Sequence, residues 1–170
     1  MFVPKWLNIW LVLSSLVVIF DASYVLLRPA TMRGGHLFPY FSPYALYIQF
    51  DTLYGNLTDS FVVIQSWLNL VEVSLILFAV ALSLSSCTIK KLVSALIVLT
   101  ASAFVFWKTV IYIWYSHDFT SAAVKNFTLD AIFVFVIPSS LWIIFPLLAI
   151  VTVTKNVAGY VKGISKTKRE

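Results

Sequence analysis

The sequence predicts an all-α protein: a polytopic membrane bundle of four helices with an aromatic loop segment on its lumenal side. Composition is the first reason, because 61% of the 170 residues are hydrophobic and 11% are charged. A soluble domain has about 25% charged residues. The second reason is that the apolar residues gather in four runs of roughly 20 residues or more, each able to cross about 30 Å of hydrocarbon as a helix. The third is that lysines cluster in the connections and the tail.

The four expected spans follow one another at residues 6–27, 61–84, 92–114 and 130–154. The first lacks the short core and small-residue cleavage site of a signal peptide, so we expect it to be retained. The connection 28–60 is the long one. Three prolines break its early part, and aromatic residues stud it: Phe38, Tyr40, Phe41, Tyr44, Tyr47, Phe50 and Tyr54. We expect it to pack over the lumenal mouth of the bundle or to lie in the interface, where Tyr is favoured.

Lysines predict the orientation. Lys5 precedes the first span, Lys90 and Lys91 join the second and third, and a basic tail at 161–170 follows the single four-span domain 1–160. This pattern predicts that both termini are cytosolic. Two sequons, which begin at Asn56 and Asn126, fall in the opposite connections.

The end of the tail also suggests a compartment. Lys166 and Lys168 stand fifth and third from the end, a spacing that resembles the dilysine signal for retrieval to the endoplasmic reticulum. A generic basic tail is the alternative interpretation. We therefore predict a multi-pass protein of the endoplasmic reticulum membrane.

Several classes of site are excluded by residue usage. Cys87 is the single cysteine, which rules out an intrachain disulfide and any multi-cysteine metal site. His36 and His117 lie far apart in expected loops. The basic tail lies beside a membrane, where it indicates cytosolic charge rather than a nucleic-acid site. We predict no metal and no cofactor, and we leave a homodimer open.

Three ionisable residues lie inside the apolar runs: Asp21, Glu72 and Lys108. A charge at membrane depth costs several kcal/mol unless it is paired, solvated or neutralised. A helical rise of about 1.5 Å per residue places Asp21 and Lys108 roughly 9 Å below the lumenal ends of their spans. Glu72 is deeper, roughly 16–18 Å in. Acids at different depths differ in how readily they release a proton, so we interpret Asp21 and Glu72 as a catalytic acid/base pair.

Other polar residues share helical faces with these three, at spacings of three or four. If the stripes face inward, they line one cavity with apolar and aromatic walls, which suits a lipophilic small molecule. The predicted substrate-binding residues are Tyr24, Gln65, Asn69, Lys108, Tyr112, Ser139 and Trp142.

Each residue also has a simpler structural interpretation. Glu72 and Lys108 form an interhelical salt bridge in one alternative, and Gln65 and Asn69 only join helices, at about 0.6 kcal/mol each. Trp142 is then ordinary packing. Asp21 reaches toward the headgroups or pairs with Arg28. Under these alternatives the protein is a structural membrane subunit without a ligand.

At these residues the chain resembles the EXPERA superfamily, which includes the emopamil-binding protein (a sterol isomerase) and the sigma-two receptor. The resemblance covers nearly the whole chain. It is carried by Asp21 with the following Leu26-Leu27-Arg28-Pro29, by Val71-Glu72, by Tyr112, and by Leu141-Trp142 with Pro146. Val17, Ser139 and Lys108 depart from the isomerase pattern, which has His at the first of these places and Asn at the second.

This resemblance implies a cofactor-independent isomerase or cyclase that acts on a sterol-like, terpenoid or polycyclic lipophile. A neutral carboxylic acid protonates an alkene or epoxide, and Trp142 stabilises the cation, an attraction of about 2 kcal/mol when desolvated. A second carboxylate then removes a proton from a neighbouring carbon. The alternative that the resemblance implies is a non-catalytic sterol- or lipid-binding protein of the sigma-two receptor type.

Overall fold

The computed structural model describes residues 2–167, with side chains for all of these except 122, 123 and 167. Within that range four helices are long and apolar enough to cross a membrane, and no strand is formed. They are α1 (Lys5–Leu26), α4 (Ser60–Ser83), α5 (Thr88–Ser116) and α8 (Ile137–Thr167). The predicted fold class, an all-α multi-pass membrane bundle, is confirmed.

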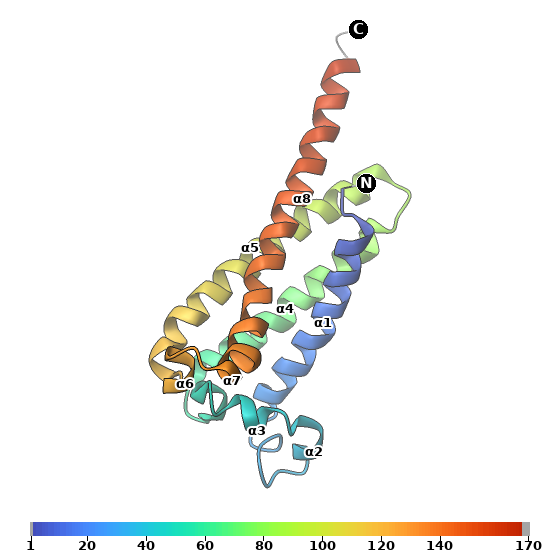
Figure 1. Cartoon of the computed structure of the whole chain (residues 1–170). Coiled ribbons are helices and arrows are strands. Elements are labelled where there is room, and N and C mark those ends of the chain that lie inside the picture. The colour runs from blue at the N-terminus through green and yellow to red at the C-terminus, as the bar shows by residue number, and fades with distance from the viewer. Residues whose placement is uncertain (1, 168–170) are drawn as a thin grey trace.

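The helices run antiparallel, so both termini lie at one end of the bundle (Figure 1). We call this the terminal end. The connections 27–59 and 117–128 lie at the opposite end, which we call the cap end (Figure 1). Large apolar side chains on the outer faces of the helices are exposed and suit contact with lipid, among them Ile9, Leu13, Trp67, Phe104 and Trp107.

The last helix is longer than the apolar run that predicted it. It continues to Thr167 rather than ending near residue 154, so the predicted tail is helical as far as the structure describes it. Residues 155–167 contain no proline, so the helix persists where the hydrophobicity stops. Lys168, which completes the dilysine spacing, lies outside the described residues.

Small residues pack the terminal half of the bundle closely. Ala79, Ala95, Ala101 and Ala149 are buried there with Leu7, Leu11, Val98 and Val153. Such residues let helix backbones approach one another in a membrane. Two hydrogen bonds add to this packing: Ser94 Oγ donates to the Ala79 carbonyl at 2.7 Å, and Asn8 Nδ2 donates to Ser83 Oγ at 2.9 Å. The larger cavity described below lies on the other side of this packing, in the cap half of the bundle.

The start of the fourth span departs from regular α-helix. A short helix, α7 (Leu129–Ala131), leads into the π-helical turn η3 (Ile132–Val136), and α8 follows. Pro138 lacks a backbone N–H and its ring excludes the usual carbonyl contact one turn earlier, which a widened turn accommodates. The wider turn and Pro138 both lie beside the cavity described below.

The segment 27–59, which we call the aromatic cap, closes the cap end. It contains α2 (Phe38–Phe41), α3 (Tyr44–Tyr47) and the short 3-10 helix η1 (Thr52–Gly55). Tyr44 of the cap stacks on Tyr24 of α1, with ring centroids 3.9 Å apart. Phe41 and Leu53 are buried against Tyr24, Val25 and Val62. The prediction that this segment packs over the mouth of the bundle is confirmed.

Hydrogen bonds fasten the aromatic cap on two sides. On one side, Arg28 of the cap donates from Nε to the Val25 carbonyl of α1 at 3.0 Å, and its guanidinium also donates to the carbonyls of Leu53, Tyr54 and Asn56 at 3.0–3.3 Å. On the other side the cap meets the connection that carries η2 (His117–Phe119) and α6 (Ala122–Lys125). There Thr52 Oγ1 donates to the Phe119 carbonyl at 2.6 Å, and Ser121 N donates to the Phe50 carbonyl at 3.0 Å. The cap is thus tied both to the end of α1 and to the connection between α5 and α8.

Candidate functional site

A cavity of about 410 Å³ lies under the aromatic cap, between the four long helices. Its volume falls within the range of about 300–1,000 Å³ that is usual for small-molecule sites. Most of its wall is apolar or aromatic. The predicted site residues that line it are Asp21, Gln65, Asn69, Lys108, Tyr112, Ser139 and Trp142. Tyr44, Tyr47 and Tyr54 line it from the cap.

Asp21 is held by two tyrosines of the cap. Tyr44 Oη donates to Oδ1 at 2.8 Å, and Tyr54 Oη donates to Oδ2 at 3.0 Å. Arg28, which was the alternative partner of Asp21, is instead occupied by backbone carbonyls. Asp21 therefore presents a carboxyl group with two phenol donors at the edge of the cavity.

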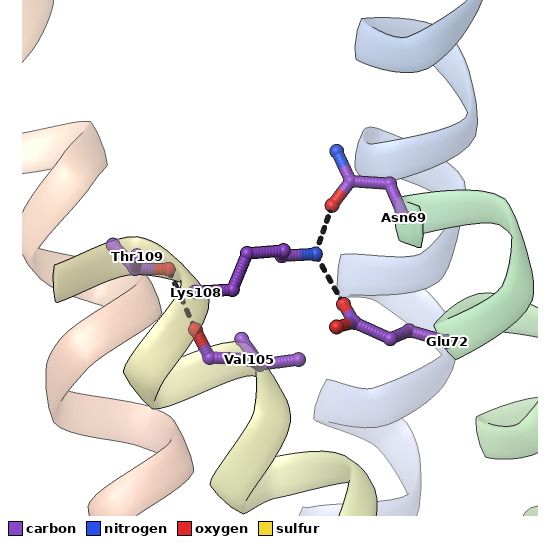
Figure 2. Close-up of polar contacts among 5 residues, drawn as sticks. All are labelled: Asn69, Glu72, Val105, Lys108 and Thr109. Atoms are coloured by element: carbon purple, nitrogen blue, oxygen red, sulfur yellow. Dashed lines mark hydrogen bonds and ion pairs between the residues drawn. The ribbon is translucent and has the colours of Figure 1, made fainter. Parts of the chain in front are cut away.

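Lys108 reaches from α5 to α4, where its ammonium group donates to Asn69 Oδ1 and Glu72 Oε2 (Figure 2). The side chains of Lys108 and Glu72 are 14% and 11% exposed. The salt bridge that was weighed as an alternative is thus present. It satisfies a charge on each helix in a place where an unpaired charge would be costly.

Glu72 faces a second, smaller cavity of about 40 Å³ that lies next to the first. This cavity is lined by Ser14, Ser15, Glu72, Ser102 and Pro146 among others, whereas Asp21 and Lys108 do not line it. Asn69 and Trp142 line both cavities. The Lys108–Glu72 pair therefore lies where the two cavities adjoin, with Lys108 lining the larger cavity and Glu72 the smaller one.

This arrangement corrects the prediction that Asp21 and Glu72 share one cavity. Helical spacing placed both carboxylates on inward faces, which is right, and the inward stripes were expected to line one cavity. Glu72 lies two turns beyond Gln65 toward the terminal end, and it lines the smaller cavity rather than the larger one. The structure brings Asp21 together with Gln65, Asn69, Lys108, Tyr112, Ser139 and Trp142, and it places Glu72 behind them.

Tyr24, which was predicted to bind substrate, does not line the larger cavity. Tyr24 is 2% exposed and is packed against Phe41, Tyr44 and Tyr54 of the cap. It lies one turn beyond Asp21 on α1, where the cap covers the helix. Its ring stacks on that of Tyr44, which does line the cavity.

Gln65 has a polar atom that is unsatisfied. Its Oε1 is buried and has no hydrogen-bond donor among the described residues, although Gln65 lines the larger cavity. A buried acceptor without a partner costs about 1–3 kcal/mol. A ligand with a hydroxyl or amide donor would recover that energy.

The sequence interpretation missed Asp51. This carboxylate of the aromatic cap is 0% exposed, and it accepts hydrogen bonds from Tyr112 Oη at 2.5 Å and from Leu53 N at 3.2 Å. Burial raises the pKa of Asp51 to about 6, although its hydrogen bonds oppose that rise. Burial and the neighbouring Asp51 carboxylate raise the pKa of Tyr47 as well. An acid among tyrosines in an aromatic segment was the available signal.

Metal binding has no obvious place in the described part of the chain. Across residues 2–167, no three His, Cys, Asp or Glu side chains gather closely enough to hold an ion. An organic ligand in the larger cavity would meet oxygen and nitrogen groups from Asp21, Gln65, Asn69 and Lys108.

The fold and the site define a multi-pass membrane protein with a ligand-sized cavity between its helices. No protein-family profile matches the chain, and neither a curated protein nor a solved structure matches it.

Proposed function

We propose that this protein binds a sterol-like or terpenoid lipophile in the larger cavity and rearranges it by proton transfer, as a cofactor-independent isomerase or cyclase of the endoplasmic reticulum membrane. The observation that carries the proposal is Asp21, a carboxyl group with two tyrosine donors in the wall of a mostly apolar cavity. Membership of the EXPERA superfamily is part of the same proposal, and rests on the motifs around Asp21, Glu72 and Trp142.

The cavity wall suggests how such a ligand lies. Val17, Val18, Val62 and Ile113 offer apolar contact to a hydrocarbon skeleton. The unsatisfied Gln65 Oε1 suits a hydroxyl group on the ligand. Trp142 contributes an aromatic ring to the cavity wall. A ligand anchored at Gln65 would then place an alkene within reach of Asp21.

Because Glu72 faces the other cavity, we assign both proton transfers to Asp21. Neutral Asp21 protonates one alkene carbon, which leaves a cation on its neighbour. Trp142 and the cap tyrosines stabilise that cation by about 2 kcal/mol or more. The Asp21 carboxylate, held by Tyr44 and Tyr54, then takes a proton from the next carbon. The double bond has moved, and Asp21 has returned to its starting state.

Solvent deuterium tests this proposal. Purified protein in deuterated water is incubated with a panel of sterol and terpenoid alkenes, and the products are analysed by mass spectrometry. We expect an isomer that carries deuterium, and we expect Asp21→Asn to lower its formation by about 10²–10⁴-fold. Asp118→Asn is the matched control, since Asp118 is an exposed acid. Full turnover by Asp21→Asn would exclude the catalytic assignment.

A second candidate is a non-catalytic sterol- or lipid-binding protein of the sigma-two receptor type. The position of Glu72 favours it, because a ligand in the larger cavity meets one of the two membrane carboxylates rather than both. Saturable binding of the same panel without deuterium in any recovered ligand would support this candidate over the enzyme.

A further inference from the structure

Lys108 is the one charged residue of the larger cavity that the proposed proton transfer does not use. Its amine lies in the wall of that cavity, in the cap half of α5, and its side chain is 14% exposed. Its two contacts, Asn69 and Glu72, both come from α4 (Figure 2). A lysine amine beside an apolar space is a nucleophile for carbonyl compounds once it gives up its proton.

We propose that Lys108 is a covalent attachment site for a lipophilic aldehyde, which it binds as a Schiff base. The amine nitrogen attacks the carbonyl carbon and forms a C–N bond, and the C–O bond then breaks. Overall, the ammonium group and the aldehyde give a protonated imine and one water, so two ammonium hydrogens leave with the carbonyl oxygen. No electrons are transferred and no oxidant or reductant is required.

Glu72 is placed to serve both ends of this reaction. It contacts the amine directly, so it can accept the proton that must leave before nitrogen attacks, and it can return that proton to the departing oxygen. The pair carries one positive and one negative charge before the reaction. Because a protonated imine is also a cation, Glu72 is left with an opposite charge beside it afterwards, and no charge becomes unpaired inside the membrane.

The smaller cavity provides room for the water. Its volume of about 40 Å³ exceeds the roughly 10–15 Å³ that one water requires. Glu72 lines it together with Ser14, Ser15 and Ser102, which offer polar partners. A water released at Lys108 therefore has a polar site in the adjoining smaller cavity. Hydrolysis of the imine can use a water held in the same cavity. The aldehyde chain stays on the apolar side.

The chemistry selects the ligand class. The cavity behind the amine is lined mainly by valines, tyrosines and Trp142, so the carbonyl compound must carry a long or cyclic hydrocarbon. An aldehyde is favoured over a ketone, because the amine is confined by Asn69 and Glu72 and a single substituent on the carbonyl carbon is easier to accommodate.

Reductive trapping of the full-length protein in detergent micelles tests the proposal. The protein is incubated with dodecenal and sodium cyanoborohydride, and the modified lysines are mapped by peptide mass spectrometry. Exposed Lys90 and Lys162 are internal references. We expect Lys108 to be modified more than about tenfold faster than either reference. With pyridoxal phosphate, a water-soluble aldehyde, we expect the opposite order. If dodecenal instead modifies the lysines in the order of their solvent exposure and leaves Lys108 unmodified, the proposal is overturned.

Two variants keep the result clear. Lys108→Arg retains the ion pair and should lose the adduct at this position while the modification of Lys90 stays unchanged. In Glu72→Gln the amine remains, and we expect modification of Lys108 to slow by about tenfold or more, because the proton acceptor is lost. If Lys108 is modified at equal rates in Glu72→Gln and in the wild-type protein, Glu72 is excluded as the proton acceptor. The inference rests on the cavity and not on proton transfer at Asp21, so the deuterium assay and the trapping assay can fail independently.

Discussion

The hydroxyl of Tyr112, on α5, donates a hydrogen bond of 2.5 Å to Oδ2 of Asp51, in the aromatic cap. Tyr112 also lines the larger cavity, so this contact joins a membrane helix, the cavity wall and the segment that closes the cap end. Asp51 caps the short helix η1 through Leu53 N at the same time. One buried carboxylate is therefore among the groups that hold the cap over the cavity.

Removal of the Tyr112 hydroxyl should lower stability. Tyr112→Phe leaves a buried acceptor on Asp51 with one fewer donor, which costs about 1–3 kcal/mol. Thermal unfolding in micelles, followed by the fluorescence of the six tryptophans, measures the change. Tyr115→Phe is the matched control: Tyr115 donates to Asp59 at 2.9 Å but is 39% exposed, and its loss should cost within about 0.5 kcal/mol. Equal effects would show that the buried contact is not special.

Asp51 should make stability depend on pH. Burial raises its pKa from 3.8 to about 6 in the folded protein, so between those values the folded chain holds a proton that the unfolded chain has released. The contribution of Asp51 to the free energy of unfolding therefore falls as pH rises through this window, by about 3 kcal/mol at most. In Asp51→Asn this slope should disappear. Thermal unfolding of both proteins from about pH 4 to 7 tests it, and identical slopes would contradict the assignment.

The Lys108–Glu72 pair should show strong coupling in a double-mutant cycle. Lys108→Met leaves Glu72 as an unpaired buried charge and should lower stability by about 3–5 kcal/mol. Lys108→Met/Glu72→Gln removes both charges, so most of that loss should be recovered. Thermal unfolding of the unmodified protein, both single variants and the double variant gives the coupling energy. Additive losses would mean that each charge is solvated independently.

Both termini should face the cytosol. The structure places them at the same end of the bundle, and the lysines at that end indicate the cytosolic side (Figure 1). Protease added to sealed microsomes should therefore digest epitope tags at either end of the chain. Protection of both tags would reverse the orientation while leaving the bundle unchanged.

The residues that line the cavities could be predicted only in part, because sequence spacing indicates which residues share a helix face but not which other helices that face meets. Gln65, Asn69 and Glu72 share a face of α4, as predicted, yet they divide between two cavities. The division depends on where Lys108 of the antiparallel helix α5 meets them. Asp51 was not predicted for a related reason. It lies in the aromatic cap, outside the apolar runs, and it is buried where the cap meets Tyr112 of α5.

The amino-acid sequence by itself determined the four spans, the inward polar stripes and the aromatic segment that covers one end. These follow from local properties, since the length of an apolar run and a repeat of 3.6 residues depend on neighbouring residues alone. The tertiary structure decided the rest: that Tyr44 and Tyr54 hold Asp21, that Lys108 pairs with Glu72, and that Tyr112 meets Asp51. Each of these contacts joins residues more than twenty positions apart, so it is set by how the helices and the cap pack together.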